Sequence, residues 1–347
     1  MASTTDPISY FIEDMAFHGR SHRTQAAYER VLTEFDGFLS DGAARPSNEA
    51  IPLEEATHRD CLAWISERRG AAAESTVASY ASYLNRFYSY MVEVGEFEEN
   101  PMTLVVEEMD ERIDTDPSRR DLGVSEMRSF VRDIGHPLDR AVIVTLLKTG
   151  IRAGELCNLD LRDVNLGDRQ VDTGPVRPEL GGRPASMFIP SEPSAGSVYN
   201  GERREESNKR KRDTVVPIDD ELATELVRWL AIRPDPLSDS APLFVSTDRT
   251  WGHRLTGPGV HHLVRQHAER AGWYETNGDS KTNVTPHYFR HFFTTHLRDR
   301  TGDRGIVKYL RGDVASDVID TYTHNWGDRV REVYEDSIYR VVDGHAG

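Results

Sequence analysis

The sequence predicts a mainly helical protein that carries a small β-sheet and is divided into two domains. Apolar residues recur at helical spacing through much of residues 6–101 and again after residue 121. Short β-type runs fall in the second half of the chain. A chain of 347 residues is long enough for two domains. We therefore expect a helical first domain at 1–105, a linker at 106–120 and an α+β second domain at 121–347.

The helices of the first domain are marked by apolar faces and by caps. Residues 21–24 precede a helix whose apolar residues follow the spacing of one buried face: Tyr28, Val31, Leu32, Phe35 and Leu39. Thr57 is placed to cap a short helix through residue 65. The most regular pattern follows Ser75 and comprises Tyr80, Tyr83, Leu84, Phe87, Tyr88 and Met91.

The first domain is expected to end near Pro101, which follows a helix-terminating Gly95. Residues 107–120 are acidic, contain Pro117 and show no sustained apolar periodicity. That composition is typical of a linker.

The second domain is expected to combine buried helices with short strands. A mostly apolar helix at 138–148 ends at Gly150. Residues 174–206 are rich in Gly, Pro, Ser and charge, which indicates an inserted loop. Strands are expected around Gln170 and Val171 and at 187–189, 214–218 and 242–245. Later helices are expected at 260–271, from 286 to 301 and at 306–310, and a final helical stretch from 330 to 341 is expected to pack on a neighbouring subunit.

Composition argues against a membrane or secreted protein. No apolar run approaches the ~18 residues needed to span a bilayer, and the N-terminus lacks the pattern of a secretory signal. Cys61 and Cys157 lie far apart and form neither a metal motif nor a disulfide framework. We expect a cytoplasmic protein in which both cysteines are buried small hydrophobes.

The net charge of −16 at first argues against a nucleic-acid partner. The basic residues are 5 Lys against 37 Arg, and an acidic, Lys-poor, Arg-rich composition indicates adaptation to molar salt. At such salt the Debye length is about 3 Å, so surface charges hardly repel one another. The alternative is an ordinary acidic protein from a GC-rich genome. Because net charge does not describe a local surface, a cluster of arginines can still bind DNA.

A first candidate site lies in the sequence from Thr149 to Leu159. Arg152 follows a glycine turn and begins the next helix, so the backbone holds it on both sides. An arginine fixed in this way suits a phosphate clamp. Glu155, three residues on, can orient its guanidinium, although a plain salt bridge at a helix start gives the same spacing.

A second candidate is the basic tetrapeptide at 209–212, just before the β-type run at 214–218. Two of the five lysines of the chain, Lys209 and Lys211, fall here. Lysine can donate a proton, whereas arginine stays charged. Their grouping in a sequence poor in lysine indicates that an ammonium group is needed at this place.

A third candidate is the stretch 285–291 together with Tyr322. Pro286 suits the first turn of a helix, and His287 and Arg290 then share one face. A histidine beside an arginine fork suits a phosphate at which a proton must move. Tyr322, followed by Thr323 and His324, supplies a phenol that can attack. Each feature alone is more often a surface pair or a core tyrosine, so their combination carries the argument.

In order, Arg152, Lys209, His287, Arg290 and Tyr322 match the catalytic set of the tyrosine recombinases, the phage-integrase and Xer-type family. The sequence resembles this family over nearly its whole length. The first domain resembles the family's SAM-like core-binding domain, and the second its catalytic domain. This resemblance implies DNA cleavage through a 3′-phosphotyrosyl link, with double-stranded DNA as partner, a tetramer on two duplexes, and neither a metal nor another cofactor.

The resemblance also implies a role for each residue. Tyr322 attacks the phosphodiester, Arg152 and Arg290 clamp it, and His287 assists proton transfer. Lys209, eight residues before Pro217, protonates the leaving 5′-oxygen, with Lys211 as the alternative because the insertion blurs the register.

One position departs from the family pattern. Nine residues before the tyrosine the family usually carries His or Trp, whereas this chain has Asp313. A carboxylate does not donate as a protonated histidine does and repels a phosphate. Either Asp313 is structural and His324 or a water molecule replaces the missing donor, or catalysis is weakened. In this and in composition the chain resembles salt-adapted archaeal integrases.

The sequence thus predicts a site-specific DNA recombinase, and two alternatives stay open. A type IB topoisomerase-like enzyme would nick and reseal DNA with the same residues without exchanging strands. A non-cleaving DNA-binding protein derived from a recombinase would explain Asp313, but it would not explain why the other five positions are kept.

Overall fold

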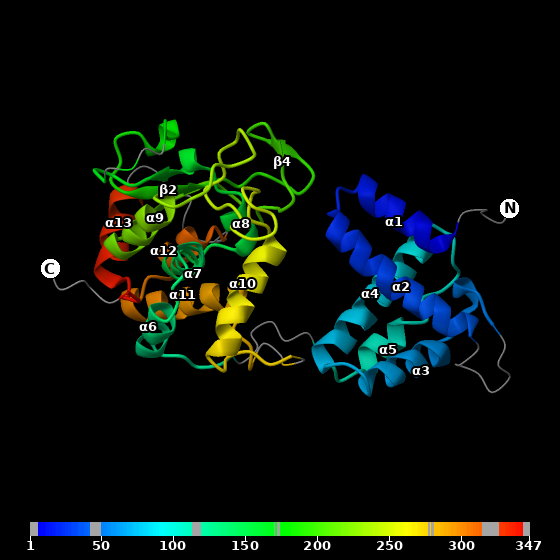
Figure 1. Cartoon of the computed structure of the whole chain (residues 1–347). Helices are drawn as coiled ribbons and strands as arrows, with labels where there is room; N and C mark the ends of the chain where they lie inside the picture. Colours follow the sequence, from blue (N-terminus) through cyan, green and yellow to red (C-terminus); the bar gives the residue numbers. More distant parts are fainter. Residues whose placement is uncertain are drawn as a thin grey trace. The chain divides into compact units, whose positions relative to one another are not determined.

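The chain forms two compact units, Met1–Pro117 and Ser118–Gly347, each with its own hydrophobic core (Figure 1). The computed structural model describes residues 6–41, 50–112, 119–169, 171, 174–276, 278, 281–313 and 326–342. A first unit of helices and a second unit of helices around a small antiparallel sheet confirm the predicted fold class. Within the described ranges, no helix has both the length and the apolar character needed to cross a membrane.

The first unit consists of helices α1 (Pro7–Phe17), α2 (His22–Ser40), α3 (His58–Arg69), α4 (Glu74–Glu93) and α5 (Thr103–Glu108), with a 3-10 turn at Leu53–Glu55. The Ser21 side chain caps α2 by accepting a hydrogen bond from the Thr24 amide (3.2 Å). Most of the predicted apolar residues of α2 and α4 are buried in the core that contains Trp64, and Tyr28, Tyr80 and Tyr83 are partly buried against it.

Two features of the first unit differ from the sequence prediction. Helix α1 was not expected as a separate element, although Phe11 is buried against Tyr28, Phe87 and Tyr90. Packing also continues beyond Pro101, because Met102 and Val105 are buried in the same core. The local acidity of 107–112 therefore marks the outer end of a packed helix as well as the start of the expected linker.

The second unit is organised around a buried helix, α7 (Pro137–Thr149), in which every residue from Ala141 to Thr149 is buried. A helix that is buried all round belongs to the interior of a domain. The other helices are α6 (Val124–Arg132), α8 (Ala153–Cys157), α9 (Asp220–Leu230), α10 (Gly257–Arg270), α11 (Pro286–Thr301), α12 (Arg304–Arg311) and α13 (Trp326–Ser337) (Figure 1). Cys157, like Cys61 in the first unit, is a buried free thiol, as expected.

The sheet of the second unit has the order β1 (Val164–Asn165), β2 (Ser186–Ile189), β5 (Thr214–Pro217), and both pairs are antiparallel. The register places Met187 opposite Val216 and Ile189 opposite Thr214. Between β2 and β5, the chain forms a second hairpin from β3 (Val198–Tyr199) and β4 (Glu202–Arg203). Two further 3-10 turns lie at Leu161–Asp163 and Pro178–Leu180.

Two predicted strands are corrected by the structure. The first strand of the sheet is β1, not Gln170–Val171: Gln170 lies outside the described residues, and Val171 is not in a strand. The run at 242–245 forms only isolated bridges, Asp160 with Pro242 and Val245 with Arg254. In both cases the pairing partner decides the strand, and local β-propensity does not reveal it.

The last helix corrects another expectation, because α13 and the residues after it pack on the chain's own second unit. The Tyr334 hydroxyl donates to the carbonyl of Lys148 (2.9 Å), and Tyr339 is buried beside it. The fully buried Lys148 ammonium pairs with Asp219 (2.6 Å) and Glu221 (2.7 Å). The apolar residues assigned from sequence to a subunit interface thus belong to the core of this unit.

Candidate functional site

Arg152 is positioned by the end of α7 and the start of α8. Gly150 ends α7 in the left-handed region with φ of 63°. A Cβ atom added there would lie 2.3 Å from a ring carbon of Phe293, so a glycine is required at this close approach. Arg152 is the N-cap residue of α8. The Thr-Gly-x-Arg motif therefore has a local structural reason for its glycine and its spacing.

Glu155 holds Arg152 from two sides. It accepts a hydrogen bond from the Arg152 backbone amide (2.9 Å) and another from Arg152 Nη1 (2.9 Å). Its second cationic partner is Arg210, at 3.3 Å. Burial opposes ionisation of Glu155, but Arg210, the Arg152 amide and the surrounding guanidinium groups outweigh it and hold its pKa below the usual value. Glu155 thus stays charged beside the Arg152 guanidinium, a contact that fits both the orienting role and the plain salt bridge expected from sequence.

Arg290 reaches the same place from α11. Nη1 donates to the carbonyl of Gly150 (2.6 Å), and Nη2 donates to the carbonyl of Arg311 (3.1 Å). The side chain is 2% exposed. Burial lowers the pKa of Arg290 to about 9, with Arg152 and Arg311 acting in the same direction. At that pKa the group is still charged at neutral pH.

Asp313 lies between the two arginines. Its Oδ1 accepts from Arg290 Nη2 (2.9 Å) and Arg152 Nη2 (3.2 Å), and its Oδ2 pairs with Arg311 Nε (3.0 Å). We call these six residues the receptor cluster: Arg152, Glu155, Arg210, Arg290, Arg311 and Asp313. The cluster contains four guanidinium groups and two carboxylates, so its formal charge is +2. Such an excess of rigid arginine donors suits a phosphate.

His287 lies one helical turn before Arg290 and remains at the exposed margin of the cluster. Removal of water by neighbouring protein atoms lowers its pKa to about 4, and Arg119, Arg290, Arg152 and Arg311 add electrostatic repulsion. The imidazole is therefore neutral at neutral pH in the absence of a bound anion. A neutral imidazole can accept a proton.

The two candidate lysines flank a buried arginine. Arg210 is 4% exposed and donates to the carbonyl of Leu310 (3.2 Å) as well as to Glu155. Lys209 and Lys211 on either side of it are exposed. The Lys211 amide donates to the carbonyl of Gly312 (3.4 Å), next to Asp313. Both lysines thus lie on the segment that borders the cluster, and the geometry keeps both as candidates.

The residue before this segment, Asn208, is held in place by hydrogen bonds. Asn208 is buried and donates to the carbonyls of Pro190 (2.9 Å) and Glu192 (3.0 Å), while its own oxygen accepts from Asn158 (2.9 Å). These bonds join the two ends of the segment between β2 and β5 that contains the β3–β4 hairpin. Lys209 therefore follows an anchored residue and precedes a buried one.

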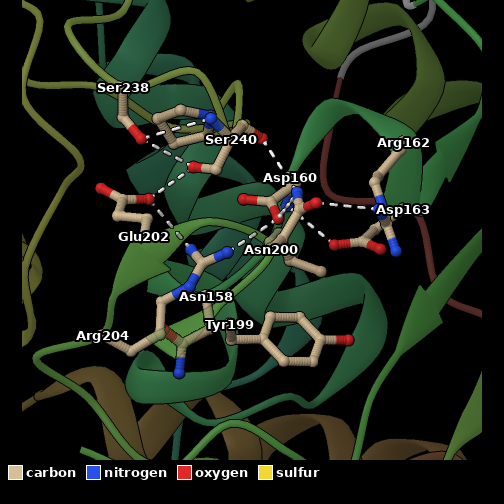
Figure 2. Close-up of polar contacts among 12 residues, drawn as sticks. Asn158, Asp160, Arg162, Asp163, Tyr199, Asn200, Glu202, Arg204, Ser238 and Ser240 are labelled. Carbon is tan, nitrogen blue, oxygen red and sulfur yellow. Dashed lines mark hydrogen bonds and ion pairs between the residues drawn. The ribbon is translucent and has the colours of Figure 1, made fainter. Parts of the chain in front are cut away.

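The insertion before Asn208 is held by a second group of charges, the insertion cluster, made of Asp160, Glu202, Arg204 and Arg254. The first three of these residues are labelled in Figure 2. Figure 2 shows Asp160 accepting hydrogen bonds from Arg204 (2.8 Å) and Asn200 (2.9 Å). Arg254 adds a bond to Asp160 (2.6 Å). These contacts fasten the β3–β4 hairpin to the chain after α8, a link that the composition of 174–206 did not reveal.

Sequence reasoning missed two members of the receptor cluster, Arg210 and Arg311. Arg210 is one of four consecutive basic residues, and nothing in that run marks it as the buried one. Arg311 closes α12 beside Gly312, and neither spacing nor composition singles it out. Their signal is burial and contact, which the sequence does not carry.

Tyr322 and His324 lie outside the described residues. Asp313 is the last described residue before them. Among the residues that the structure describes, no group of three or more His, Cys, Asp or Glu forms a metal site.

Two family models match the chain. The model of the phage integrase family matches residues 129–327. The model of the phage integrase N-terminal SAM-like domain matches residues 8–95.

Curated relatives include the tyrosine recombinase XerC of Pelobacter propionicus, which is 23% identical over 316 residues. The alignment covers 91% of this chain and 89% of that protein. The tyrosine recombinase XerA of Pyrococcus furiosus is 28% identical over 197 residues, which are 57% of this chain and 54% of that protein. Among solved structures, the Tn1549 transposon integrase in complex with transposon right end DNA superposes with a TM-score of 0.65 at 18% identity, covering 96% of this chain and 99% of that one. A lambda integrase dimer bound to a core site gives a TM-score of 0.59 at 14% identity over 89% and 94% of the two chains.

Proposed function

Because the chain belongs to the phage integrase family, we propose that it is a site-specific DNA recombinase that cuts and rejoins DNA through a 3′-phosphotyrosyl intermediate. The observation that carries this proposal is the convergence of Arg152 and Arg290 on one anion position, marked by the carboxylate of Asp313. Two sequence segments that lie 138 positions apart supply these guanidinium groups. Such convergence is what an in-line displacement at a phosphodiester requires.

The nucleophile in this mechanism is the Tyr322 hydroxyl. A phenol with an ordinary pKa of about 10 is a weak nucleophile at neutral pH, so it must lose its proton during attack. The phenolic oxygen forms a bond to phosphorus, and the bond to the 5′-oxygen breaks. The phosphotyrosyl ester retains the energy of the diester, so rejoining needs no nucleotide cofactor.

Arg152 and Arg290 stabilise the negative charge that the pentacoordinate phosphate gains. Both guanidinium groups are held by protein partners before any substrate arrives, Arg152 by Glu155 and Arg290 by two backbone carbonyls. Donors fixed in advance need little rearrangement during the reaction, which makes them effective in the transition state.

His287 takes part in proton transfer. Its depressed pKa leaves it neutral and ready to accept the phenolic proton. A bound phosphate would offset the repulsion from Arg119, Arg152, Arg290 and Arg311 and would stabilise the protonated form. The imidazole would thus gain basicity in the complex in which it is needed.

Lys209 or Lys211 supplies the proton to the leaving 5′-oxygen. Both are exposed on a segment anchored by Asn208 and Arg210. An ammonium group can give up its proton, whereas the neighbouring guanidinium groups stay charged. We retain Lys209 as the first candidate from its spacing to Pro217, with Lys211 as the second.

The partner is double-stranded DNA. Residues 1–105 would act as the core-binding domain and 121–347 as the catalytic domain, with a tetramer on two duplexes exchanging strands. Relatives at 14–18% identity in complexes with DNA support this partner. The Arg-rich, acidic composition supports action in a cytoplasm of high salt.

A topoisomerase-like enzyme or a non-cleaving descendant would use the same fold. The relatives named as tyrosine recombinases favour strand exchange over both. Asp313 is the observation that favours a non-cleaving protein, but Arg152 and Arg290, two of its three arginine partners, remain in place.

Covalent trapping tests the proposal. The protein and Tyr322→Phe are incubated with fragmented host DNA in molar KCl, denatured and examined for protein that carries DNA. The unaltered protein is expected to form an adduct, and Tyr322→Phe is expected to form none while binding DNA within a few-fold. Binding without an adduct would favour the non-cleaving alternative, and an adduct in the variant would move the nucleophile elsewhere.

A further inference from the structure

The carboxylate of Asp313 has the contacts expected of a bound anion. Three arginines from separate elements surround it: Arg152 at the start of α8, Arg290 on α11 and Arg311 at the end of α12. One carboxylate oxygen bridges Arg152 and Arg290, the pair assigned above to the scissile phosphate.

The backbone delivers this carboxylate to a fixed place. Gly312 ends α12 with φ of 70°, and its amide donates to the carbonyl of Tyr309 (2.8 Å). The Asp313 amide donates to the carbonyl of Lys308 (3.0 Å), which completes a Schellman motif. A Cβ atom at Gly312 would come within 2.4 Å of Arg210, so the turn and the receptor cluster are packed together. Asp313 is thus part of a helix stop and does not lie on the cluster by chance.

The position of Asp313 is also accessible. Its side chain is 27% exposed, and that of Arg152 is 30% exposed, whereas Arg290 is 2% exposed. An anion from solvent can therefore approach the face on which Asp313 lies. With four guanidinium groups and two carboxylates, the cluster keeps a charge of +2 while Asp313 is bound, so attraction for a further anion remains.

We propose that Asp313 is an internal competitor for the scissile phosphate: in the DNA-free protein it occupies the anion position between Arg152 and Arg290, and a DNA phosphate binds there by displacing it. This inference rests on the proposed function, which identifies the anion position as the site of the scissile phosphate. It assigns a role to a carboxylate at a position where a phosphate-binding cluster gains nothing from negative charge.

Displacement has a consequence for selectivity. A phosphate that meets the cluster alone must replace ion pairs that already exist, so its net gain is small. A duplex that also contacts other parts of the protein supplies the remaining free energy. Asp313 therefore weakens the occupation of the cluster by phosphates at incorrect sites.

The first test compares Asp313→Asn with the unaltered protein in DNA affinity as a function of KCl. Asparagine keeps the shape and removes the charge, so the phosphate no longer competes with a carboxylate. We expect affinity at low salt to rise about tenfold and the slope of log K against log salt to become steeper by about 0.9, the value of one phosphate that meets arginines not already neutralised by a carboxylate. Asp299→Asn is the matched control, because this exposed carboxylate pairs only with its neighbour Arg298 among the ion pairs of the described residues.

A second measurement needs no DNA. Inorganic phosphate at constant ionic strength stabilises a protein that binds it, by mass action. The rise in Tm with phosphate is expected to be larger in Asp313→Asn than in the unaltered protein and in Asp299→Asn. If Asp313→Asn does not fold, Asp313→Ser removes the same charge with a smaller side chain and takes its place in both measurements.

An unchanged salt slope and an unchanged response to phosphate in a folded variant would overturn the inference and leave Asp313 as a support for the arginines. This outcome differs from failure of the proposed function. If the unaltered protein formed no Tyr322-dependent adduct while Asp313→Asn gained phosphate binding, the competitor would stand and the recombinase would not.

Discussion

The second unit contains two clusters of arginines and carboxylates that differ in charge and in exposure. The insertion cluster has two arginines and two carboxylates and is electrically balanced, and both Arg204 and Asp160 have side chains with 0% exposure. The receptor cluster has four arginines and two carboxylates, and Arg152, Arg311 and Asp313 are each 27–30% exposed.

This difference separates a structural cluster from one that can bind a ligand. In the insertion cluster the two carboxylates balance the charge of the two guanidinium groups, so a further anion would meet no excess charge. In the receptor cluster Glu155 fixes one arginine, backbone carbonyls fix another, and a positive excess remains at a place that solvent reaches. Both clusters pair arginines with carboxylates, and charge balance and access to solvent distinguish them.

The largest expected effect is loss of cleavage in Arg152→Ala. Removing a donor to the developing charge is expected to slow adduct formation by about 10²–10³-fold. Stability should change little, because the side chain is partly exposed and Glu155 keeps Arg210 as a partner. The rate of adduct formation and the Tm are measured on the same preparation.

Arg254→Ala supplies the opposite case. It leaves part of a buried ion-pair network unpaired, which is expected to lower the free energy of unfolding by about 3 kcal/mol. The adduct rate of the folded protein should stay within a few-fold of the unaltered rate. Equal losses of cleavage in the two variants, at a temperature where both are folded, would remove the distinction between the clusters.

The next effect concerns Lys209 and Lys211, which lie on the segment that joins the two clusters. Replacing the lysine that protonates the leaving oxygen is expected to slow cleavage by about 10²-fold. A 5′-thiol leaving group needs no protonation, so it should restore the rate of that variant alone. Lys209→Ala and Lys211→Ala are compared on both substrates. Rescue of Lys211→Ala and not of Lys209→Ala would shift the assigned register by two residues.

The smallest effect is on stability as a function of pH. Folding lowers the pKa of His287 from about 6.5 to about 4, so the unfolded chain binds more protons between these values. The contribution of neutral His287 to the free energy of unfolding is present above pH 6.5 and is lost as the pH falls towards 4. In the insertion cluster, burial raises the pKa of Glu202, but Arg254 and Ser240 outweigh it and lower the net value. Its stabilisation is therefore lost only at lower pH.

Urea unfolding at pH 7 and pH 5 checks this separation. His287→Gln should lose less stability than the unaltered protein over that interval. An identical loss in both would place the proton uptake on another group.

Elements of the second unit could be predicted from sequence where a local rule applies. Gly150 and Gly312 are helix stops with positive φ, and β2 and β5 show β-type runs, so these positions were predictable. The motifs identified Arg152 and Arg290 as candidates. The resemblance to the family was enough to predict that their side chains act on one phosphate.

The remainder depends on contacts between distant residues. β1 has two residues, and its partner Met187 rather than its own propensity makes it a strand. Arg210 is buried because Glu155 and the carbonyl of Leu310 meet it, and no local pattern records either contact. The same holds for Arg204, whose partner Asp160 lies 44 residues away. Ion pairs of this kind are specified by the fold and not by spacing.

The central claim is that Arg152 and Arg290 neutralise the charge of the scissile phosphate. Once adduct sequencing has given the target site, a duplex with an uncharged methylphosphonate at the cleaved position tests this claim directly. On the phosphate substrate Arg290→Ala should cleave far more slowly than the unaltered protein. On the methylphosphonate substrate that difference should shrink to within about tenfold, because there is less charge to neutralise. An equal loss on both substrates would contradict the account and would assign Arg290 to the structure of the α11–α12 region alone.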